Sequence, residues 1–366
     1  MHKIKHLWPQ VVDAGNISRA IDMSSIGKRN RRDVKKVLAN KGRYICLAQE
    51  MLTNHTFQPV LGSELTVYDK TARKTRIIHR PRYWPDQVMH WALMQPLAPI
   101  LQRSLYQYSC GSIPGRGTHC AVKYLKHALR NNYIGTKYCL KFDISKYYSS
   151  IPPELMDAEM GRRIADKDVL WLLRAFISLG IKIGYYTSQW LANIYLARTD
   201  WWIKQDLGAP YYIRYIDDFV ILGPNKRKLH KLRAELFDHL HNELRLNIKG
   251  DWQLFKVGGN DLRGKPVNGR GIDFLGYVFY HGYTLLRKRT ALRIMRRSGK
   301  IVRRGASNVQ YADAAAMMSY LGILKHCDSH GLTKKYIYEP LSVAKMKGVI
   351  SNEGKIRAAA CGGFYD

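Results

Sequence analysis

Acidic residues are scarce in this chain of 366 amino acids. Aspartate and glutamate total 28, against 60 lysines and arginines, which gives a formal net charge of +32. An excess this large favours a polyanionic partner, because every phosphate that a cation neutralises releases a condensed counterion. The alternative is a merely soluble basic protein, but the balance lies far from the mixed-sign surface of a typical domain. The composition therefore favours a nucleic acid as partner.

Long apolar runs and paired cysteines are also missing. No stretch reaches the roughly 18 apolar residues that cross a bilayer, so we expect no membrane partner. The N-terminal MHKIKHLWPQ is basic but has no apolar segment behind it, so we do not expect a secretion signal. The cysteines form no C-x-x-C pair, which indicates neither a zinc site nor a redox motif and fits a reducing cytoplasm. They are Cys46, Cys110, Cys120, Cys139, Cys327 and Cys361.

The composition otherwise suits a folded α+β protein. Hydrophobic residues make up 46% of the chain and 24 residues are tyrosine, so a sizeable core can form. Apolar spacing predicts helices over 28–53 (with Gly42 as a break), 86–105, 153–165, 167–179, 188–207, 226–246 and 310–326. Alternation and apolar runs predict a hairpin over 65–80 and strands over 138–144, 211–215, 219–222, 252–257 and 272–280.

The sharpest pattern is Tyr215-Ile216-Asp217-Asp218 between two short apolar strands. Adjacent acids at the tip of a hairpin repel each other, so a fold needs a reason to keep them. A bound divalent cation is one such reason. A second acid, Asp143, ends the apolar strand of FDISKYYSSI. Alone it reads equally well as a turn or cap residue. Together, the two strands predict a site for two Mg²⁺ ions, with Mn²⁺ as an alternative.

Several motifs in a fixed order resemble those of reverse transcriptases, over about residues 60 to 335. FDISKYYSSI resembles the family's motif A, GIKIGYYTSQWLANIYL (180–196) its motif B, and YIRYIDDFVIL its motif C. SCGSIPGRGTH (109–119) is similar to the segment before the palm and GIDFLGYVF (271–279) to the primer-grip region. The resemblance implies an RNA-directed DNA polymerase, a nucleotidyltransferase that binds an RNA template, an RNA–DNA hybrid and dNTPs.

The resemblance also implies roles for the acidic site. Asp143, Asp217 and Asp218 would be the catalytic and metal-binding residues, joined by the backbone carbonyl of Ile144. Lys249 in LNIKGDW stands where a general-acid lysine could protonate pyrophosphate.

Nucleotide binding is implied for four further residues. Tyr148, five residues after Asp143, would be the steric gate that excludes a ribose 2′-hydroxyl. Arg76 would grip the triphosphate, since its fork binds phosphate oxygens bidentately, with Lys74 and Lys70 assisting. Without the resemblance, Tyr148 reads as core and the basic residues as ordinary hairpin charges.

Motif B narrows the family. Most relatives have Q-G-x-x-x-S-P there, whereas this chain has I-G-x-x-x-S-Q from Ile183 to Gln189. That form resembles reverse transcriptases of diversity-generating retroelements, related to group II intron-type bacterial enzymes. It implies an error-prone, bacterial or phage-encoded enzyme that misreads template adenines during mutagenic homing, with a basic oligomeric accessory protein as partner. Ile183 and Gln189 are then fidelity residues, and Gln189 also contacts the nucleotide; the alternative is neutral drift at a packed position.

The implied fold is a right hand. We expect an N-terminal extension and fingers over 1–95, a palm over 96–284 with a fingers insertion around 150–182, and a helical thumb and tail over 285–366. The thumb's basic run LLRKRTALRIMRRSGKIVRR would track the hybrid by shape and backbone charge, although a solvated helix face is the alternative. The primer grip would comprise Phe274, Leu275, Gly276 and Tyr277.

Two rival functions stay open. An antiviral defence reverse transcriptase that uses a structured noncoding RNA would have nearly the same polymerase core. A non-catalytic RNA-binding scaffold would need only the basic charge, and the three intact acids argue against it. A group II intron enzyme is disfavoured, because S-Q replaces S-P and the sequence shows no maturase-type tail.

Overall fold

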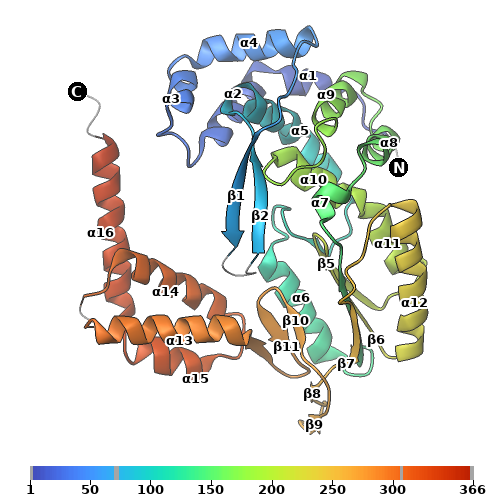
Figure 1. The fold of residues 1–366 in the computed structure, drawn as a ribbon, viewed down its shortest axis with the longest axis vertical. Coiled ribbons are helices and arrows are strands. Elements are labelled where there is room, and N and C mark those ends of the chain that lie inside the picture. The colour runs from blue at the N-terminus through green and yellow to red at the C-terminus, as the bar shows by residue number, and fades with distance from the viewer. Residues whose placement is uncertain (1–2, 70–73, 306–307, 363–366) are drawn as a thin grey trace. The chain divides into compact units, whose positions relative to one another are not determined.

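The computed structural model describes residues 3–69, 74–305 and 308–362 (Figure 1). These residues form two compact units. Unit 1 comprises residues 1–117, 140–221 and 227–253, and unit 2 comprises 118–139, 222–226 and 254–366. Within the described residues, no helix combines the length and hydropathy needed to cross a membrane.

Helices make up most of unit 1. They are α1 (Trp8–Val12), α2 (Ala14–Ser25), α3 (Arg32–Ala39), α4 (Lys41–Thr53), η1 (Tyr83–Gln87), α5 (Val88–Ser104), α7 (Tyr147–Ser150), α8 (Pro153–Arg163), α9 (Lys167–Ile177), α10 (Tyr186–Tyr195), α11 (Ala197–Gln205), α12 (Lys226–Asp238) and η2 (His239–Glu243). The mainly apolar α5 lies at the centre and contacts α1, α2 and α10. Its burial outweighs Pro96 and Pro99, which cost backbone hydrogen bonds inside the helix.

The strands of unit 1 position the acids. They are β1 (Ser63–Asp69), β2 (Lys74–Arg80), β3 (Ser109–Cys110), β4 (Tyr138–Asp143), β5 (Tyr211–Tyr215) and β6 (Asp218–Gly223). β1 and β2 form a separate antiparallel ribbon (Figure 1), while β3, β5, β6 and β4 are neighbours in that order. Phe142 stacks on Phe219 at 4.5 Å and meets the edge of Phe237 at 5.0 Å, so α12 packs on this sheet.

Unit 2 combines short strands with a helical C-terminal part. Its elements are α6 (Thr118–Asn131), β7 (Gln253–Lys256), β8 (Gly259–Asn260), β9 (Pro266–Val267), β10 (Ile272–Phe274), β11 (Tyr277–Phe279), β12 (Thr284–Leu286), α13 (Lys288–Arg303), α14 (Tyr311–Leu324), α15 (His330–Thr333), η3 (Lys334–Tyr338) and α16 (Val343–Gly362). β10, β11 and β12 form an antiparallel sheet, and α14 packs against both α13 and α16.

Three of the predicted elements have a different form in the structure. The helical region 28–53 breaks at Asn40 instead of Gly42, because the Asn40 amide caps the end of α3 by donating to Lys36 O at 3.1 Å. The stretch 188–207 divides at Leu196 into α10 and α11, with no breaker residue there. The predicted strand 272–280 is a tight hairpin, since Leu275 and Gly276 both have positive φ, as a two-residue turn requires.

Candidate active site

The acidic turn joins β5 to β6 and is strained. Ile216 has φ 57°, which is unusual for a β-branched residue. Three contacts hold it there: Ile216 N donates to Cys110 O at 3.0 Å, Ile216 O accepts from Arg214 Nη1 at 2.7 Å, and the Ile216 side chain lies against Gly111. Strain that its surroundings enforce in this way is typical of functional sites, because it fixes a geometry that a relaxed turn would lose.

Asp143 reaches the same place from β4, which is the neighbour of β6. Ile144 N donates to Asp217 O at 3.1 Å, and Lys249 N donates to Asp143 O at 2.9 Å. The predicted convergence of Asp143 with the turn is therefore present, although the two segments are more than 70 residues apart in sequence.

The electrostatics of the acids suit a cation. Burial, and after it the charge of Asp143, raises the pKa of Asp217 to about 6. Burial also raises the pKa of Asp218 to about 7, although the charge of Lys141 opposes the shift. Both carboxyls therefore resist ionisation unless positive charge is supplied.

Two lysines supply part of that charge. Lys249 Nζ forms an ion pair with Asp143 Oδ2, and Lys141 Nζ lies 3.8 Å from Asp218 Oδ2. No three His, Cys, Asp or Glu side chains among the described residues surround one point as a preformed metal centre would. The two ion pairs direct one oxygen of Asp143 and one of Asp218 toward ammonium groups.

The donor set nevertheless fits magnesium. Among the described residues, Asp143 Oδ1 and Asp218 Oδ1 are buried and have no hydrogen-bond partner. A buried carboxylate oxygen without a partner is costly, and Mg²⁺ prefers a small number of carboxylate oxygens. Asp143, Asp217 and Asp218 are thus the residues that would hold the metal.

The raised pKa values predict a pH-dependent metal requirement. Metal binding needs ionised carboxylates, so protons compete with Mg²⁺ while pH lies below the pKa values of about 6 and 7. We expect the Mg²⁺ concentration that half-saturates the site to fall by roughly tenfold for each pH unit from 6 to 7 and to level off above 8. Mg²⁺ titrations at pH 6, 7 and 8 measure this concentration. The same Mg²⁺ midpoint at all three pH values would contradict the prediction.

Stability without metal has the matching sign. Unfolded carboxyls ionise near pH ~4, whereas Asp217 and Asp218 stay protonated to about 6 and 7 in the fold. The folded state therefore binds more protons, and these groups lower stability as pH rises through that window. Thermal unfolding in EDTA should show the decrease, and Mg²⁺ should restore more stability at pH 8 than at pH 5.5.

A buried ion pair beneath the turn was not expected from the sequence. Arg214 and Asp200 both have fully buried side chains and meet at 2.6 Å. Asp200 also accepts from Ser109 Oγ at 2.5 Å and from Tyr212 Oη at 2.6 Å. Because Arg214 holds the Ile216 carbonyl, this network connects α11 and β3 to the acidic turn. An arginine inside an apolar strand is the one sequence signal that could have indicated it.

Tyr148 lies beside the acids. Burial raises its pKa to about 12, and the charge of Asp217 adds to the shift. The phenol therefore stays neutral near pH 7, which suits a steric role better than proton transfer. Its role as a gate stays a prediction.

The hairpin residues are placed less completely. Arg76 lies in β2, opposite Val67 of β1, with an exposed side chain. Lys74 begins β2, but its side chain and all of Lys70 lie outside the described residues. Phe274 and Tyr277 belong to unit 2, where both are buried, so only the Leu275-Gly276 turn of the predicted primer grip is available for contacts.

Motif B forms a loop followed by α10. Ile183 lies in the loop and Gln189 in the first half of α10, and both are half-buried. Ser188 Oγ accepts from Lys182 N at 3.1 Å and closes the loop onto the helix. The loop therefore presents Ile183 in a fixed conformation.

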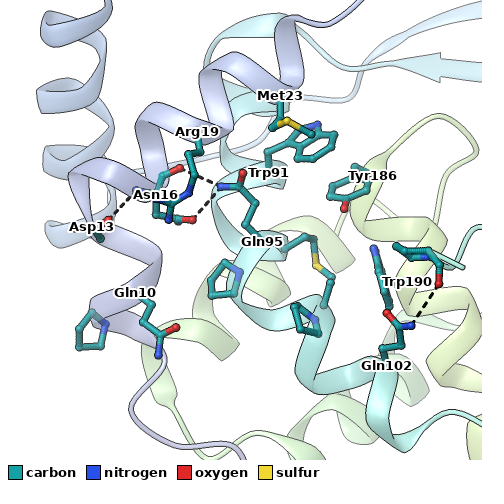
Figure 2. Close-up of a pocket in the computed structure, with 16 residues that line it drawn as sticks. Gln10, Asp13, Asn16, Arg19, Met23, Trp91, Gln95, Gln102, Tyr186 and Trp190 are labelled. Carbon is teal, nitrogen blue, oxygen red and sulfur yellow. Dashed lines mark hydrogen bonds between the residues drawn. The ribbon is translucent and has the colours of Figure 1, made fainter.

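A separate cavity of about 790 Å³ lies on another side of α10. Figure 2 shows Trp91 of α5 and Tyr186 of α10 on its wall. The two rings stack with their centroids 4.3 Å apart. Asp13 is its one acidic lining residue among those described, and none of the three site acids lines it. The cavity is thus distinct from the acidic site.

The sequence of this chain matches a known protein family and a known protein. The family described as "Reverse transcriptase (RNA-dependent DNA polymerase)" matches residues 69–279, more than half of the chain. Protein YkfC of Escherichia coli strain K12 is 24% identical over 308 residues, which cover 72% of this chain and 76% of that protein.

Two telomerase structures are also similar. Truncated apo telomerase from Candida tropicalis has a TM-score of 0.44 at 12% identity, covering 64% of this chain and 58% of its own. Telomerase from Candida albicans, in complex with a TWJ fragment of telomeric RNA, has a TM-score of 0.48 at 10% identity, covering 77% and 57%. This chain spans less than two thirds of either.

The family match covers the acidic turn, Asp143 and motif B, and the α+β fold expected from the motifs is confirmed. The chain belongs to the reverse transcriptase (RNA-dependent DNA polymerase) family.

Proposed function

We propose that this protein is an RNA-directed DNA polymerase whose catalytic residues are Asp143, Asp217 and Asp218. The observation that carries the proposal is the convergence of Asp143, at the end of β4, with the Asp217-Asp218 turn before β6. The pKa values of Asp217 and Asp218 are raised, and Asp143 Oδ1 and Asp218 Oδ1 are buried without a hydrogen-bond partner. When bound, two Mg²⁺ ions would activate a primer 3′-hydroxyl and stabilise the leaving pyrophosphate.

The protein's own residues position the substrates. Arg76 binds the triphosphate as a bidentate donor, and Tyr148 blocks a ribose 2′-hydroxyl. Lys249, which is paired with Asp143, is the general acid that protonates the leaving pyrophosphate. The formal charge of +32 favours binding of a template–primer duplex through its phosphates.

Primer extension on an RNA template with dNTPs and Mg²⁺ tests the proposal. The expected result is full-length cDNA that requires the metal. A wild-type protein that binds RNA but makes no metal-dependent product would leave only the non-catalytic scaffold.

We further propose that the enzyme is error-prone at template adenines, as in diversity-generating retroelements. The support is the I-G-x-x-x-S-Q form of motif B, with Ile183 and Gln189 half-buried beside the loop that Ser188 closes.

This finer proposal predicts an uneven error spectrum. Misincorporation opposite template adenine should exceed that opposite the other bases, as read by sequencing the cDNA. Ile183→Gln and Gln189→Pro, which install the residues of most relatives, should change the spectrum more than the rate. Equal error rates at all four template bases would remove the diversification role and leave the polymerase activity intact.

A further inference from the structure

The loop before α10 is bonded to the root of the β1–β2 hairpin. His79 N of β2 donates to Ile183 O at 2.8 Å. On the other side of the root, Gly62 N, just before β1, donates to Tyr185 Oη at 2.8 Å, and this bond is buried. We call these residues together with Gly184 the loop–hairpin latch.

Gly184 lets the two backbones approach. A Cβ atom there would lie 2.1 Å from His79 O, a distance that real Cβ atoms do not reach, and the residue has φ +113°. Gly180 in the same loop also has a positive φ, +76°, but a Cβ there would meet only the Lys182 side chain at 3.4 Å. The need for glycine at 184 therefore includes a contact with the hairpin, whereas the need at 180 is conformational.

The loop side of the latch is rigid. The Tyr185 side chain is buried, and its ring lies 5.2 Å from that of His90 and 6.4 Å from that of His79. His90 in turn stacks on Phe176 at 3.9 Å and is hydrogen-bonded to Thr187 Oγ1 at 3.0 Å. Tyr185 Oη is thus aimed at the hairpin by packing on every side.

The hairpin side depends on such support. A two-stranded ribbon is marginally stable by itself, and both of its faces expose apolar side chains, namely Leu65, Val67, Tyr68 and Ile77. The latch lies at its root, three residues along β2 from Arg76. Small changes at the root therefore change where Arg76 lies relative to Ile183.

We propose that Tyr185 and Gly184 are positioning residues for nucleotide selection, holding Arg76 at a fixed offset from Ile183 and Gln189. The inference rests on the proposed polymerase function and refines it. The latch touches none of the three acids, so loosening it should weaken the grip on the incoming dNTP and its discrimination while the chemical step keeps its rate.

Tyr185→Phe tests the hydrogen bond, because it removes only the hydroxyl. A buried donor left unpaired shifts a local equilibrium by roughly tenfold, so we expect KM for dNTPs to rise roughly three- to tenfold with kcat within about twofold. Misincorporation should rise with it. Tyr186→Phe is the matched control: it lies next in the chain, faces the cavity of Figure 2 and should leave both constants unchanged.

Gly184→Ala tests the close approach, with Gly180→Ala as its control. Both add a methyl group at a positive φ in one loop, but only the first meets backbone of the hairpin. Of the two glycine variants, we expect only Gly184→Ala to raise KM and the error rate. We expect Tyr185→Phe and Tyr186→Phe to have similar melting temperatures.

Three results would overturn the inference. An active wild-type enzyme whose Tyr185→Phe variant keeps its KM and error rate rejects the latch and leaves the polymerase proposal standing. If kcat and the melting temperature of Tyr185→Phe both fall while KM is unchanged, the role of Tyr185 is purely structural. An inactive wild-type protein rejects the polymerase function itself and the inference with it.

Discussion

Replacing Asp217 by asparagine should abolish Mg²⁺-dependent primer extension, with a loss in kcat of roughly 10³-fold or more. Asparagine keeps the size of the side chain but removes the negative charge that a metal needs. Metal ions stabilise transition-state charge by several kcal/mol, and each 1.36 kcal/mol is about tenfold in rate. Steady-state primer extension with a saturating RNA–primer duplex measures the loss.

The same substitution should not destabilise the protein. Burial and the charge of Asp143 raise the pKa of Asp217, so its ionised form is unfavourable in the metal-free fold. A neutral amide relieves that repulsion, and we expect the melting temperature in EDTA at pH 8 to hold or rise. An inactive but fully stable variant identifies a site whose charges serve function at a cost in stability.

Asp251→Asn is the matched control. It removes one exposed carboxylate from the same unit and should leave activity within about twofold, since surface charges contribute little. If Asp217→Asn retained a tenth or more of wild-type activity, Asp217 would not be a metal ligand. If Asp251→Asn lost as much as Asp217→Asn, the effect would reflect net charge instead of the site.

The acids could be predicted from the sequence because their signal is local. Asp143 ends an apolar strand, and Asp217 and Asp218 lie at a tight hairpin turn, so a short window shows both the structure and the chemistry. The pairing of β4 with β6 then brings Asp143 close to Asp217 and Asp218. The same holds for the β1–β2 hairpin, which follows from the alternation of side chains on both sides of a basic turn.

The supporting contacts could not be predicted from local patterns, because each joins segments that are far apart in the sequence, and Lys249 was expected near the acids only through the resemblance. Lys249 reaches Asp143 across 106 residues and Tyr185 reaches Gly62 across 123. The pairing of Arg214 with Asp200 needs a helix and a strand to be placed in three dimensions first. The partners in each of these pairs are far apart in the sequence, so no local pattern indicates that the fold brings them within hydrogen-bond distance.

Replacing Asp200 by asparagine should destabilise the protein by about 3–5 kcal/mol, because it leaves the Arg214 guanidinium buried without a counter-charge. Burial by itself lowers the pKa of Arg214, and the charge of Asp200 outweighs that effect, so the pKa is raised. The loss is a large part of the roughly 5–15 kcal/mol that holds a domain folded. Urea unfolding followed by circular dichroism measures it.

Glu154→Gln is the control for this variant. It breaks the exposed Arg245–Glu154 pair, whose atoms meet at 2.8 Å, and should cost less than about 1 kcal/mol because solvent screens the charges. Equal losses for the two variants would show that Asp200 and Arg214 do not act as a buried pair.

A double variant separates stability from activity. Asp200→Leu with Arg214→Met replaces the ion pair by apolar groups, which often restores stability, since no buried charge is left unpaired. It cannot restore the donor at Arg214 Nη1 that holds Ile216 O at 2.7 Å, and so it leaves the strained turn free to relax. We expect a fold that is more stable than Asp200→Asn but whose kcat stays at least about tenfold below wild type, since small displacements of catalytic groups are costly. Full recovery of activity would mean that packing alone holds the acidic turn.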